Sequence, residues 1–310
     1  MQRRKLGNSG LKVSVVGLGC NNFGRAIDLE GSRKVVDKAF DLGINFFDTA
    51  DIYGRGASER ILGEVLGARR HEIVLATKVG MVMDDAGLLI GGSRRYIMAS
   101  VEGSLKRLKT DHIDLYYMHQ TDPSTPIEES LRAMDDLVHQ GKVRYIACSN
   151  FPGWQVADAH WTSKHLNLNA FVASQDEYSL VQRKPEAELI PSIAARGMGL
   201  VPYFPLASGL LTGKYRKDAM PKGARLTESA YFANWHLSDA NWKKVEGLEA
   251  FCKAKGHSLI ELAFSWLAAQ PAVASIIAGA TTPEQLEQNA KSAGWALDAD
   301  DLAAVDKLTK

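Results

Sequence analysis

The 310-residue sequence has little of several features that mark whole classes of proteins. It contains only three cysteines, at positions 20, 148 and 252, without a CxxC spacing, which excludes a disulfide scaffold and favours a reduced compartment. No apolar run approaches the roughly 18 to 20 residues that a membrane-spanning helix needs. The N-terminal region also lacks the cleavage site of a signal peptide. We therefore expect a soluble cytoplasmic protein that is not inserted in a membrane.

An excess of charge of either sign is also missing. Lysine and arginine total 37 and aspartate and glutamate 36, so the formal net charge is +1, which argues against nucleic acid or a membrane surface as a partner bound by bulk charge. Hydrophobic residues make up 45% of the chain, enough for a large core. At about 150 residues per domain the length suggests two domains, but an α/β barrel commonly fills about 250 residues as one. Length alone leaves both arrangements open.

Short β-branched segments alternate with segments of helical periodicity along the whole chain. The eight predicted strands are residues 13–20, 45–49, 73–79, 113–119, 144–149, 170–175, 199–204 and 275–279. The predicted helices are residues 32–42, 58–66, 94–108, 127–140, 153–164, 185–195, 242–255, 258–269, 283–293 and 298–307. Strands separated by helices are parallel and joined by right-handed crossovers, and eight such units close into a barrel.

The sequence thus predicts a single (β/α)8 TIM barrel over residues 1–310, with extra helices, and a doubly wound open sheet is the alternative. The alternation is interrupted after the seventh strand, where a long loop over residues 213–240 contains several aromatic residues. Loops of this length inside a compact domain are usually lids or binding loops.

Ionisable side chains occupy the ends of three consecutive strands, where barrel active sites lie. Asp48, Lys78 and His119 stand at the ends of the second, third and fourth strands, and Tyr53 follows Asp48 by five residues. Each alone has an ordinary structural explanation, such as a turn cap or a loop aromatic. Together they form a proton-transfer group, because a buried ammonium stabilises a phenolate and a carboxylate keeps that ammonium charged. We expect Lys78 and Asp48 to lower the pKa of Tyr53 from about 10 toward 7, which needs roughly 4 kcal/mol.

The segments around these residues resemble the aldo-keto reductase family. The matching segments are GINFFDTADIYG at 43–54, ATK at 76–78, IDLYYMH at 113–119, GKVRYIACSN at 141–150, PLASGLLTGK at 205–214 and GATTPEQLEQN at 279–289. The resemblance implies NAD(P)H-dependent reduction of an aldehyde or ketone, with Asp48, Tyr53, Lys78 and His119 as a catalytic tetrad. Tyr53 would give its proton to the carbonyl oxygen, or accept one in alcohol oxidation, and His119 would orient the carbonyl.

The same matching implies a set of cofactor-binding residues. Ser149, Asn150 and Gln175 resemble residues that hold the nicotinamide carboxamide, and Tyr203 resembles the aromatic ring that stacks on the nicotinamide. The other residues implied to bind the cofactor are Gly19, Asn21, Leu206, Ser208, Gly209, Leu210, Lys214, Arg225, Gly279, Thr281, Gln285, Gln288 and Asn289. Residues 206–214 would hold the pyrophosphate, and residues 279–289 would surround the adenosine.

Two departures bear on the choice of cofactor. Thr281, Thr282 and Gln285 stand where many NADPH-specific relatives carry arginine, and Gln288 stands where glutamate is common. The habit of the family and Arg225 nevertheless favour NADP(H), with NAD(H) as the alternative. The segment GLGCNN at 17–22 lacks the third glycine of a GxGxxG dinucleotide motif, as expected for a family that binds the cofactor across the barrel mouth.

Other functions are weighed against this one. The family resemblance also includes channel-associated regulatory subunits that bind nicotinamide cofactors, but these typically replace His119 with asparagine. A metal-dependent hydrolase is disfavoured because the sequence has no HxH or HExxH motif. We expect a small-molecule aldehyde or ketone as substrate and no metal, and both a monomer and a homo-oligomer stay open. Candidates for an apolar wall of the substrate pocket are Phe23, Met81, Met83, Phe151, Tyr178, Tyr231 and Trp235.

Overall fold

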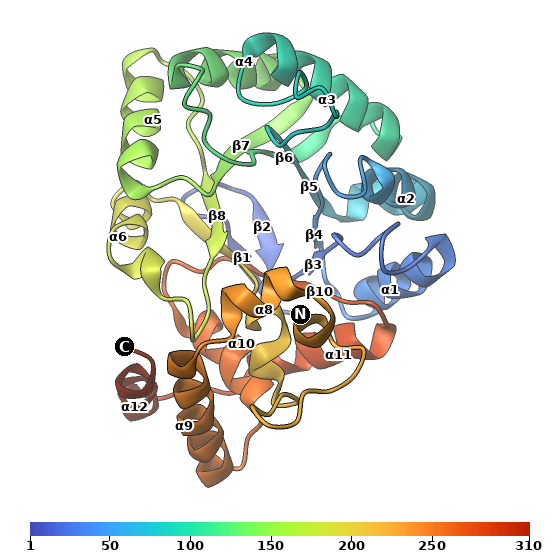
Figure 1. Cartoon of the computed structure of the whole chain (residues 1–310). Coiled ribbons are helices and arrows are strands. Elements are labelled where there is room, and N and C mark those ends of the chain that lie inside the picture. Colours follow the sequence, from blue (N-terminus) through green and yellow to red (C-terminus); the bar gives the residue numbers. More distant parts are fainter.

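A single eight-stranded sheet organises the computed structural model, which describes all 310 residues. The strands are β3 (Val16–Gly19), β4 (Phe46–Asp48), β5 (Val74–Val79), β6 (Ile113–Met118), β7 (Val143–Ser149), β8 (Ala173–Glu177), β9 (Gly199–Tyr203) and β10 (Ile276–Gly279). They are parallel and follow the order β10-β3-β4-β5-β6-β7-β8-β9. The sheet closes where Leu200 of β9 pairs with Val273, just before β10. The predicted (β/α)8 barrel is confirmed (Figure 1).

Helices surround the barrel (Figure 1). They are α1 (Leu29–Asp41), α2 (Ala57–Leu66), α3 (Arg94–Leu108), α4 (Ile127–His139), α5 (Gly153–His165), α6 (Leu189–Ala194), α9 (Asp239–Lys255), α10 (Leu259–Ala269), α11 (Pro283–Lys291) and α12 (Ala299–Thr309). Ser258 and Asp298 form capping boxes at the starts of α10 and α12, which satisfy backbone N–H groups that a helix end leaves free. None of these helices has both the length and the apolar run required to cross a bilayer.

The core is divided by the wall of the barrel. A cluster of 63 buried residues lies mainly between the outer face of the strands and the helices, and a cluster of 12 fills the barrel interior. Adjacent residues of a strand belong to different clusters, as Tyr116 and Tyr117 do, because successive side chains point to opposite faces of a sheet. Most of the strands are therefore buried on both faces and largely apolar, whereas β8 has the polar sequence ASQDE.

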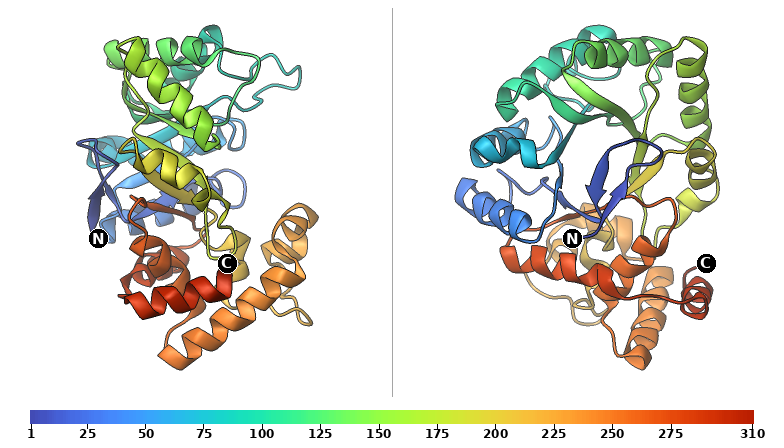
Figure 2. Two further views of the ribbon diagram at one scale, coloured as in Figure 1. Left: turned by 90° about the vertical axis from the view of Figure 1, so that its left-hand side faces the viewer. Right: turned by 180° about the vertical axis from the view of Figure 1, so that it is seen from behind.

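The first predicted strand, residues 13–20, is wrong in its extent. Its beginning belongs to an antiparallel hairpin of β1 (Arg3–Lys5) and β2 (Lys12–Ser14), and the barrel strand β3 starts at Val16. The chain turns between them because the Ser14 backbone N–H donates to Asn45 Oδ1 at 2.7 Å, and Asn45 N–H donates to Ser14 Oγ at 3.2 Å. The hairpin covers the amino-terminal end of the barrel (Figure 2).

Two other predicted segments differ in detail. The predicted helix 185–195 is a short 3-10 turn, Lys184–Glu186, followed by α6. The predicted loop 213–240 contains two short helices, α7 (Arg225–Glu228) and α8 (Ala230–His236). These two helices, which we call the lid, project beside the carboxyl end of the barrel (Figure 2). Helix formation and aromatic contacts order the lid. Sequence periodicity does not reveal helices this short, because they span too few residues.

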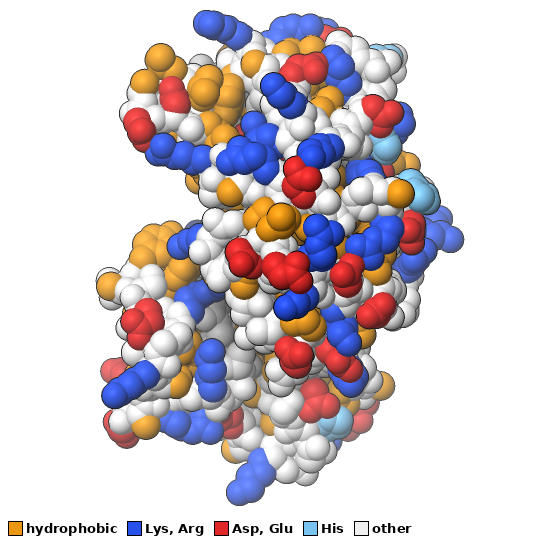
Figure 3. All heavy atoms as spheres, turned by 90° about the vertical axis from the view of Figure 1, so that its right-hand side faces the viewer, with side chains coloured by type: hydrophobic (Ala, Val, Ile, Leu, Met, Phe, Trp, Pro, Cys, Tyr) orange, Lys and Arg blue, Asp and Glu red, His pale blue; other side chains and the backbone are white.

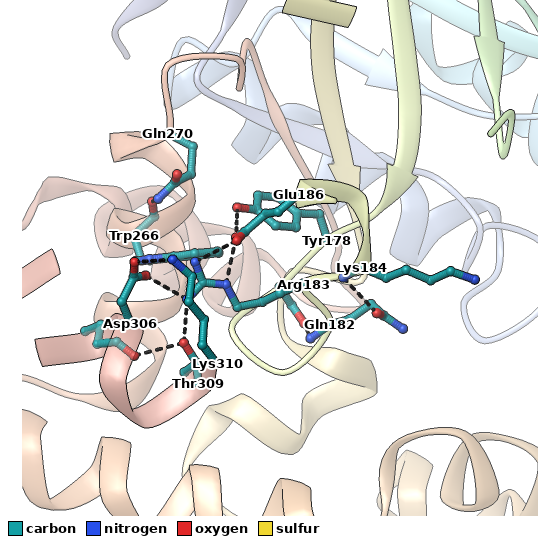
Figure 4. Close-up of polar contacts among 12 residues, drawn as sticks. Tyr178, Gln182, Arg183, Lys184, Glu186, Trp266, Gln270, Asp306, Thr309 and Lys310 are labelled. Atoms are coloured by element: carbon teal, nitrogen blue, oxygen red, sulfur yellow. Dashed lines mark hydrogen bonds and ion pairs between the residues drawn. The ribbon is translucent and has the colours of Figure 1, made fainter. Parts of the chain in front are cut away.

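The C-terminal helix α12 is attached to the barrel by Arg183, in the loop after β8 (Figure 4). Its guanidinium donates to both carboxylate oxygens of Glu186, at 2.7 and 3.0 Å, and to Asp306 Oδ1 at 2.7 Å. It also lies 4.9 Å from the ring of Trp266 on α10. Such a planar fork with two carboxylate partners and an aromatic face is geometry that lysine does not reproduce. Arg183 therefore joins β8, α10 and α12.

Candidate active site

A hollow opens at the carboxyl end of the barrel. In Figure 3 it lies on the left of the molecule, between an upper and a lower projection whose rims both carry hydrophobic side chains. Figure 2 shows that the loop after β5 and the lid flank this end, opposite the hairpin. The predicted proton-transfer residues come from the strands below, since Asp48 ends β4, Lys78 lies in β5 and His119 follows β6. These strands are neighbours in the sheet, so their ends meet at one place.

Lys78 and Asp48 form a buried ion pair. Lys78 Nζ donates to Asp48 Oδ1 at 2.5 Å and to the carbonyl oxygen of Thr49 at 2.7 Å, and its side chain is 0% exposed. Gln175 Nε2 donates to the second oxygen of Asp48 at 2.8 Å. Burial opposes a charge on Lys78, but Asp48 and Tyr53 outweigh it and raise the pKa of Lys78. The structure therefore holds a permanent positive charge in the barrel mouth.

Tyr53 is brought to this charge by a tight turn after β4. The Tyr53 N–H donates to Ala50 O at 3.2 Å, and Arg55 and Gly54 adopt positive φ angles of 49° and 58°. The Tyr53 ring centroid lies 5.2 Å from Lys78 Nζ and 6.0 Å from the His119 ring. All four predicted residues therefore meet in one site.

The expected lowering of the Tyr53 pKa is wrong in its net direction. Burial raises the pKa of Tyr53 above 10, and Asp48 adds to this increase, whereas the charge of Lys78 and its hydrogen bond to the phenol act in the opposite direction. The ion pair with Asp48 offsets much of the positive potential that the phenolate would experience. In this environment the phenol keeps its proton at neutral pH.

His119 is a neutral imidazole in the same site. Burial, together with the charge of Lys78, lowers the pKa of His119 to about 3, because both disfavour an added positive charge. Its backbone is held on both sides, since its N–H donates to Val79 O at 2.8 Å and its carbonyl accepts from Asn150 Nδ2 at 2.9 Å. Its ring Nδ1 is buried and has no partner in the protein.

The residues predicted to hold a nicotinamide lie next to this group and contact one another. Asn150 has a φ of 59°, donates to Ser149 Oγ at 3.0 Å and accepts from the Tyr203 hydroxyl at 2.8 Å. Ser149 Oγ donates to the carbonyl oxygen of Gln175 at 2.8 Å. Since Gln175 also donates to Asp48, one hydrogen-bonded chain connects these four residues to the ion pair.

The segment after β9 fits a phosphate-bearing group. Ala207, Ser208 and Gly209 all have positive φ angles, of 46°, 57° and 103°, a sharply turned backbone of the kind that lets successive N–H groups face an anion. Ser208 Oγ is buried and has no partner, which leaves a hydroxyl free for a ligand. Leu206 is half-buried next to this turn, whereas the side chain of Leu210 belongs to the core.

The residues predicted to surround the adenosine do not all lie at one site. A Cβ atom at residue 279 would lie only 3.0 Å from Asn21 Oδ1. Glycine at this position therefore leaves room between the end of β3, at Gly19, and the end of β10. Gln285 Oε1 accepts from both the N–H and the hydroxyl of Thr281 at 2.9 Å. Asn289 is buried on α11, whereas Gln288 is exposed and lines a separate outer groove with three glutamates and Lys291.

Two arginines lie near each other at the rim, and the sequence pointed to only one of them. Arg225 donates to Asn22 Oδ1 at 3.3 Å and lies 5.5 Å from the ring of Phe232. Burial and the nearby charge of Arg25 lower the pKa of Arg225. The Lys214 ammonium lies over the ring of Tyr215 at 5.1 Å. Arg25 stands alone in the loop after β3 without a motif around it, so no sequence signal marks it.

The predicted apolar wall is corrected at three positions. Phe23, Phe151 and Tyr178 are buried in the core, and Tyr178 packs on Trp266 at 5.1 Å, outside the barrel. Tyr178 lies just after the end of β8, where the chain leaves the barrel wall. The candidates that stay partly or largely exposed are Met81, Met83, Tyr231 and Trp235. Phe204 was missed, although its ring contacts the rings of both Phe232 and Trp235 in the lid.

Comparisons with known proteins agree with this arrangement. Residues 15–310 match the model of the aldo/keto reductase family. The chain belongs to the aldo/keto reductase family. It is 39% identical over 302 residues to a probable voltage-gated potassium channel subunit beta of Arabidopsis thaliana, covering 94% of this chain and 91% of that protein.

Two bacterial members of the family have names that refer to oxidoreductase chemistry. An uncharacterized oxidoreductase of Bacillus subtilis, YrpG, is 37% identical over 99% of this chain and 96% of its own length. The L-glyceraldehyde 3-phosphate reductase of Escherichia coli strain K12 is 34% identical over 94% of this chain and 87% of its own length. Membership supports an oxidoreductase that acts on small-molecule carbonyl compounds and uses a nicotinamide cofactor.

Proposed function

We propose that this aldo/keto reductase reduces an aldehyde or ketone with NADPH, and that Tyr53 donates the proton. The observation that carries the proposal is the convergence of Tyr53, His119 and the buried pair Lys78 and Asp48 at the barrel mouth. The cofactor, when bound, supplies the hydride, so the protein contributes position and electrostatics.

Each of the four side chains has a distinct role in the proposed reaction. Tyr53 gives its phenolic proton to the carbonyl oxygen as that oxygen gains negative charge. Lys78 stabilises the phenolate that is left behind, and Asp48 and the Thr49 carbonyl hold the ammonium in place. His119, neutral because of its low pKa, orients the substrate carbonyl by hydrogen bonding.

The raised pKa of Tyr53 supports reduction as the favoured direction at neutral pH. A phenol that keeps its proton is ready to act as an acid, whereas alcohol oxidation needs the phenolate as a base. The reverse reaction is therefore expected to gain rate as the pH rises toward the pKa of the phenol.

The residues that would hold the cofactor form a path across the mouth. Ser149, Asn150, Gln175 and Tyr203 would hold the nicotinamide, and the free hydroxyl of Ser208 fits the pyrophosphate. We propose NADPH over NADH because Arg225 and the nearby Arg25 place two positive charges at the rim, which would favour an additional phosphate. The test compares kcat/KM for NADPH and NADH.

A second candidate is a nicotinamide-binding regulatory subunit, which the 39% identity to a channel subunit beta favours. The imidazole of His119 beside Tyr53 favours an enzyme instead. A spectrophotometric screen of aldehydes and ketones with NADPH distinguishes the two. Turnover that is saturable in substrate supports the enzyme, and tight NADPH binding without turnover of any carbonyl supports the regulatory subunit.

A further inference from the structure

A second cavity lies at the end of the barrel opposite the mouth. It has a volume of about 380 Å³ and lies between the turn of the β1–β2 hairpin, the start of β7, the end of α5 and the turn after α6. Its lining residues are Asn8, Ser9, Val138, Arg144, Tyr145, Ile146, His160, Lys164, Asn169, Ala170, Phe171, Val172, Arg196 and Gly197. This volume is in the range of pockets that hold small molecules.

The charges around this cavity are of one sign. Arg144, Lys164, Arg196 and His160 line it, and no aspartate or glutamate does, although positive and negative residues are nearly equal in the chain as a whole. His160 and Lys164 are four residues apart on α5, so they lie on the same face of that helix. Burial and the charges of Arg196 and Lys164 lower the pKa of His160, so its imidazole is neutral at pH 7 and the positive charges of the cavity are those of Arg144, Lys164 and Arg196.

The guanidinium of Arg196 is held in place, but one of its hydrogen-bond donors has no partner. Its Nη1 donates to the carbonyl oxygen of Ser192 at 2.6 Å and to Ser192 Oγ at 3.1 Å, whereas its Nε is buried without a partner. A buried donor left unpaired is unfavourable, so Arg196 keeps hydrogen-bonding capacity that its contacts to Ser192 do not use. Arg144 donates only to the Gly141 carbonyl, so its guanidinium has no carboxylate hydrogen-bonded to it.

Carboxylates near the cavity are bound to other groups. Asp135 Oδ1 accepts from the N–H and the amide group of Asn169, both at 2.8 Å, and its Oδ2 lies 3.2 Å from His139. Asp111 is hydrogen-bonded to His112 at 2.6 Å and is exposed, although it also interacts with the charge of Arg144. Neither carboxylate lines the cavity, so the positive region is available to an external anion.

We propose that this basal cavity binds a small phosphate monoester. Arg196, Lys164 and Arg144 would contact the phosphate, which accepts charge-assisted hydrogen bonds from several donors at once. The apolar part of the lining, with Tyr145, Phe171 and Val172 among others, would contact the organic part of the ligand. The site is separate from the barrel mouth and does not depend on the proposed reaction.

Isothermal titration calorimetry of the protein saturated with NADP⁺, which occupies the proposed adenosine site at the mouth, tests the proposal with three probes: inorganic phosphate, AMP, and adenosine as the uncharged control. We expect phosphate and AMP to bind saturably, AMP more tightly, and adenosine not to bind. Arg196→Gln is expected to weaken AMP binding about tenfold, the effect of losing one charge-assisted hydrogen bond. Lys164→Gln changes an exposed side chain, so it should weaken AMP binding in the same direction and checks that a folding defect is not responsible.

The matched control is Lys214→Gln, which removes one positive charge at the mouth. Unchanged AMP binding in this variant, with weaker binding in Arg196→Gln and Lys164→Gln, supports the basal site. The proposal is overturned if neither phosphate nor AMP binds up to about 10 mM, or if Lys214→Gln weakens binding and the two basal variants do not. Equal affinity for phosphate and AMP would overturn the assignment of an organic part to the ligand.

Discussion

The two ends of the barrel bury charge in different ways. At the mouth, the positive charge of Lys78 is fully buried and is matched by Asp48 at 2.5 Å. At the base, the hairpin closes the barrel with Leu6 and Val13, both 0% exposed, and the charged side chains lie outside this apolar closure, around a cavity. A buried charge is tolerated only when it is paired and hydrogen-bonded, so the mouth must keep a preformed ion pair. The base is free to be apolar in its interior.

The largest effect is expected from Tyr53→Phe, which removes the proposed proton donor at the mouth. Carbonyl reduction should fall by about a hundredfold to ten-thousandfold, the usual contribution of a positioned acid, while NADPH binding measured by fluorescence is unchanged. Tyr117→Phe is the matched control, because the Tyr117 ring lies 5.7 Å from the same Lys78 ammonium and its buried hydroxyl has no partner. Wild-type rates for Tyr53→Phe would contradict its assignment.

Lys78→Met tests whether the mouth depends on its ion pair. The variant leaves Asp48 buried without its cation, so the free energy of unfolding should fall by about 3–5 kcal/mol, and turnover should be lost. Adding Asp48→Asn removes the unpaired charge and should restore most of the stability but no activity. Chemical denaturation measures the first effect and an NADPH-coupled assay the second. If stability is unchanged in the single variant, the pair is not as buried as described.

Leu6→Ala tests how much the apolar packing at the base of the barrel contributes to stability. Removing a fully buried leucine side chain should cost about 3 kcal/mol of unfolding free energy, with kcat and KM unchanged at temperatures where the variant is folded. Leu29→Ala, at a residue that is 43% exposed, is the control and should change stability by less than about 0.5 kcal/mol. A large loss of activity in folded Leu6→Ala would show that the two ends are coupled.

Arg225→Gln tests whether the positive charge at the rim of the mouth contributes to NADPH binding. The KM for NADPH should rise about tenfold, close to 1.4 kcal/mol, with a smaller change for NADH and no change in kcat. Lys222→Gln, three residues earlier and exposed, removes the same charge as a control. An equal change for NADPH and NADH would assign Arg225 to a phosphate that the two cofactors share.

The remaining prediction concerns the pH dependence of stability that His119 produces. With a folded-state pKa of about 3 against about 6.5 for an unfolded histidine, the folded chain binds fewer protons between these values. The contribution of His119 to stability is therefore complete above pH 6.5 and is lost as the pH falls from 6.5 toward 3. NMR titration should show no His119 inflection near pH 6.5, and His119→Asn should flatten this part of the stability curve. An inflection near 6.5 would contradict a neutral imidazole.

Much of the fold and of the active site could be predicted from the sequence. The alternation of strands and helices indicated eight parallel strands, and Asp48, Lys78 and His119 could be placed together because parallel neighbours end at the same edge. The hairpin was missed because residues 13–20 are mostly apolar and rich in valine, and the turn at Ser14 depends on a hydrogen bond to Asn45, 31 residues away. A one-dimensional pattern does not contain such a contact.

The sequence by itself determined the barrel and the residues at its mouth, since both follow from local periodicity and from the order of the strands. Only the tertiary structure decided the direction of the Tyr53 pKa shift, because the cost of burial and the compensation of Lys78 by Asp48 depend on distances and on excluded water. It also decided that Tyr178 faces away from the mouth and that Arg25 lies near Arg225. The basal cavity also depends on the tertiary structure, because its basic residues come from β7, α5 and the turn after α6, which only the folded barrel brings together.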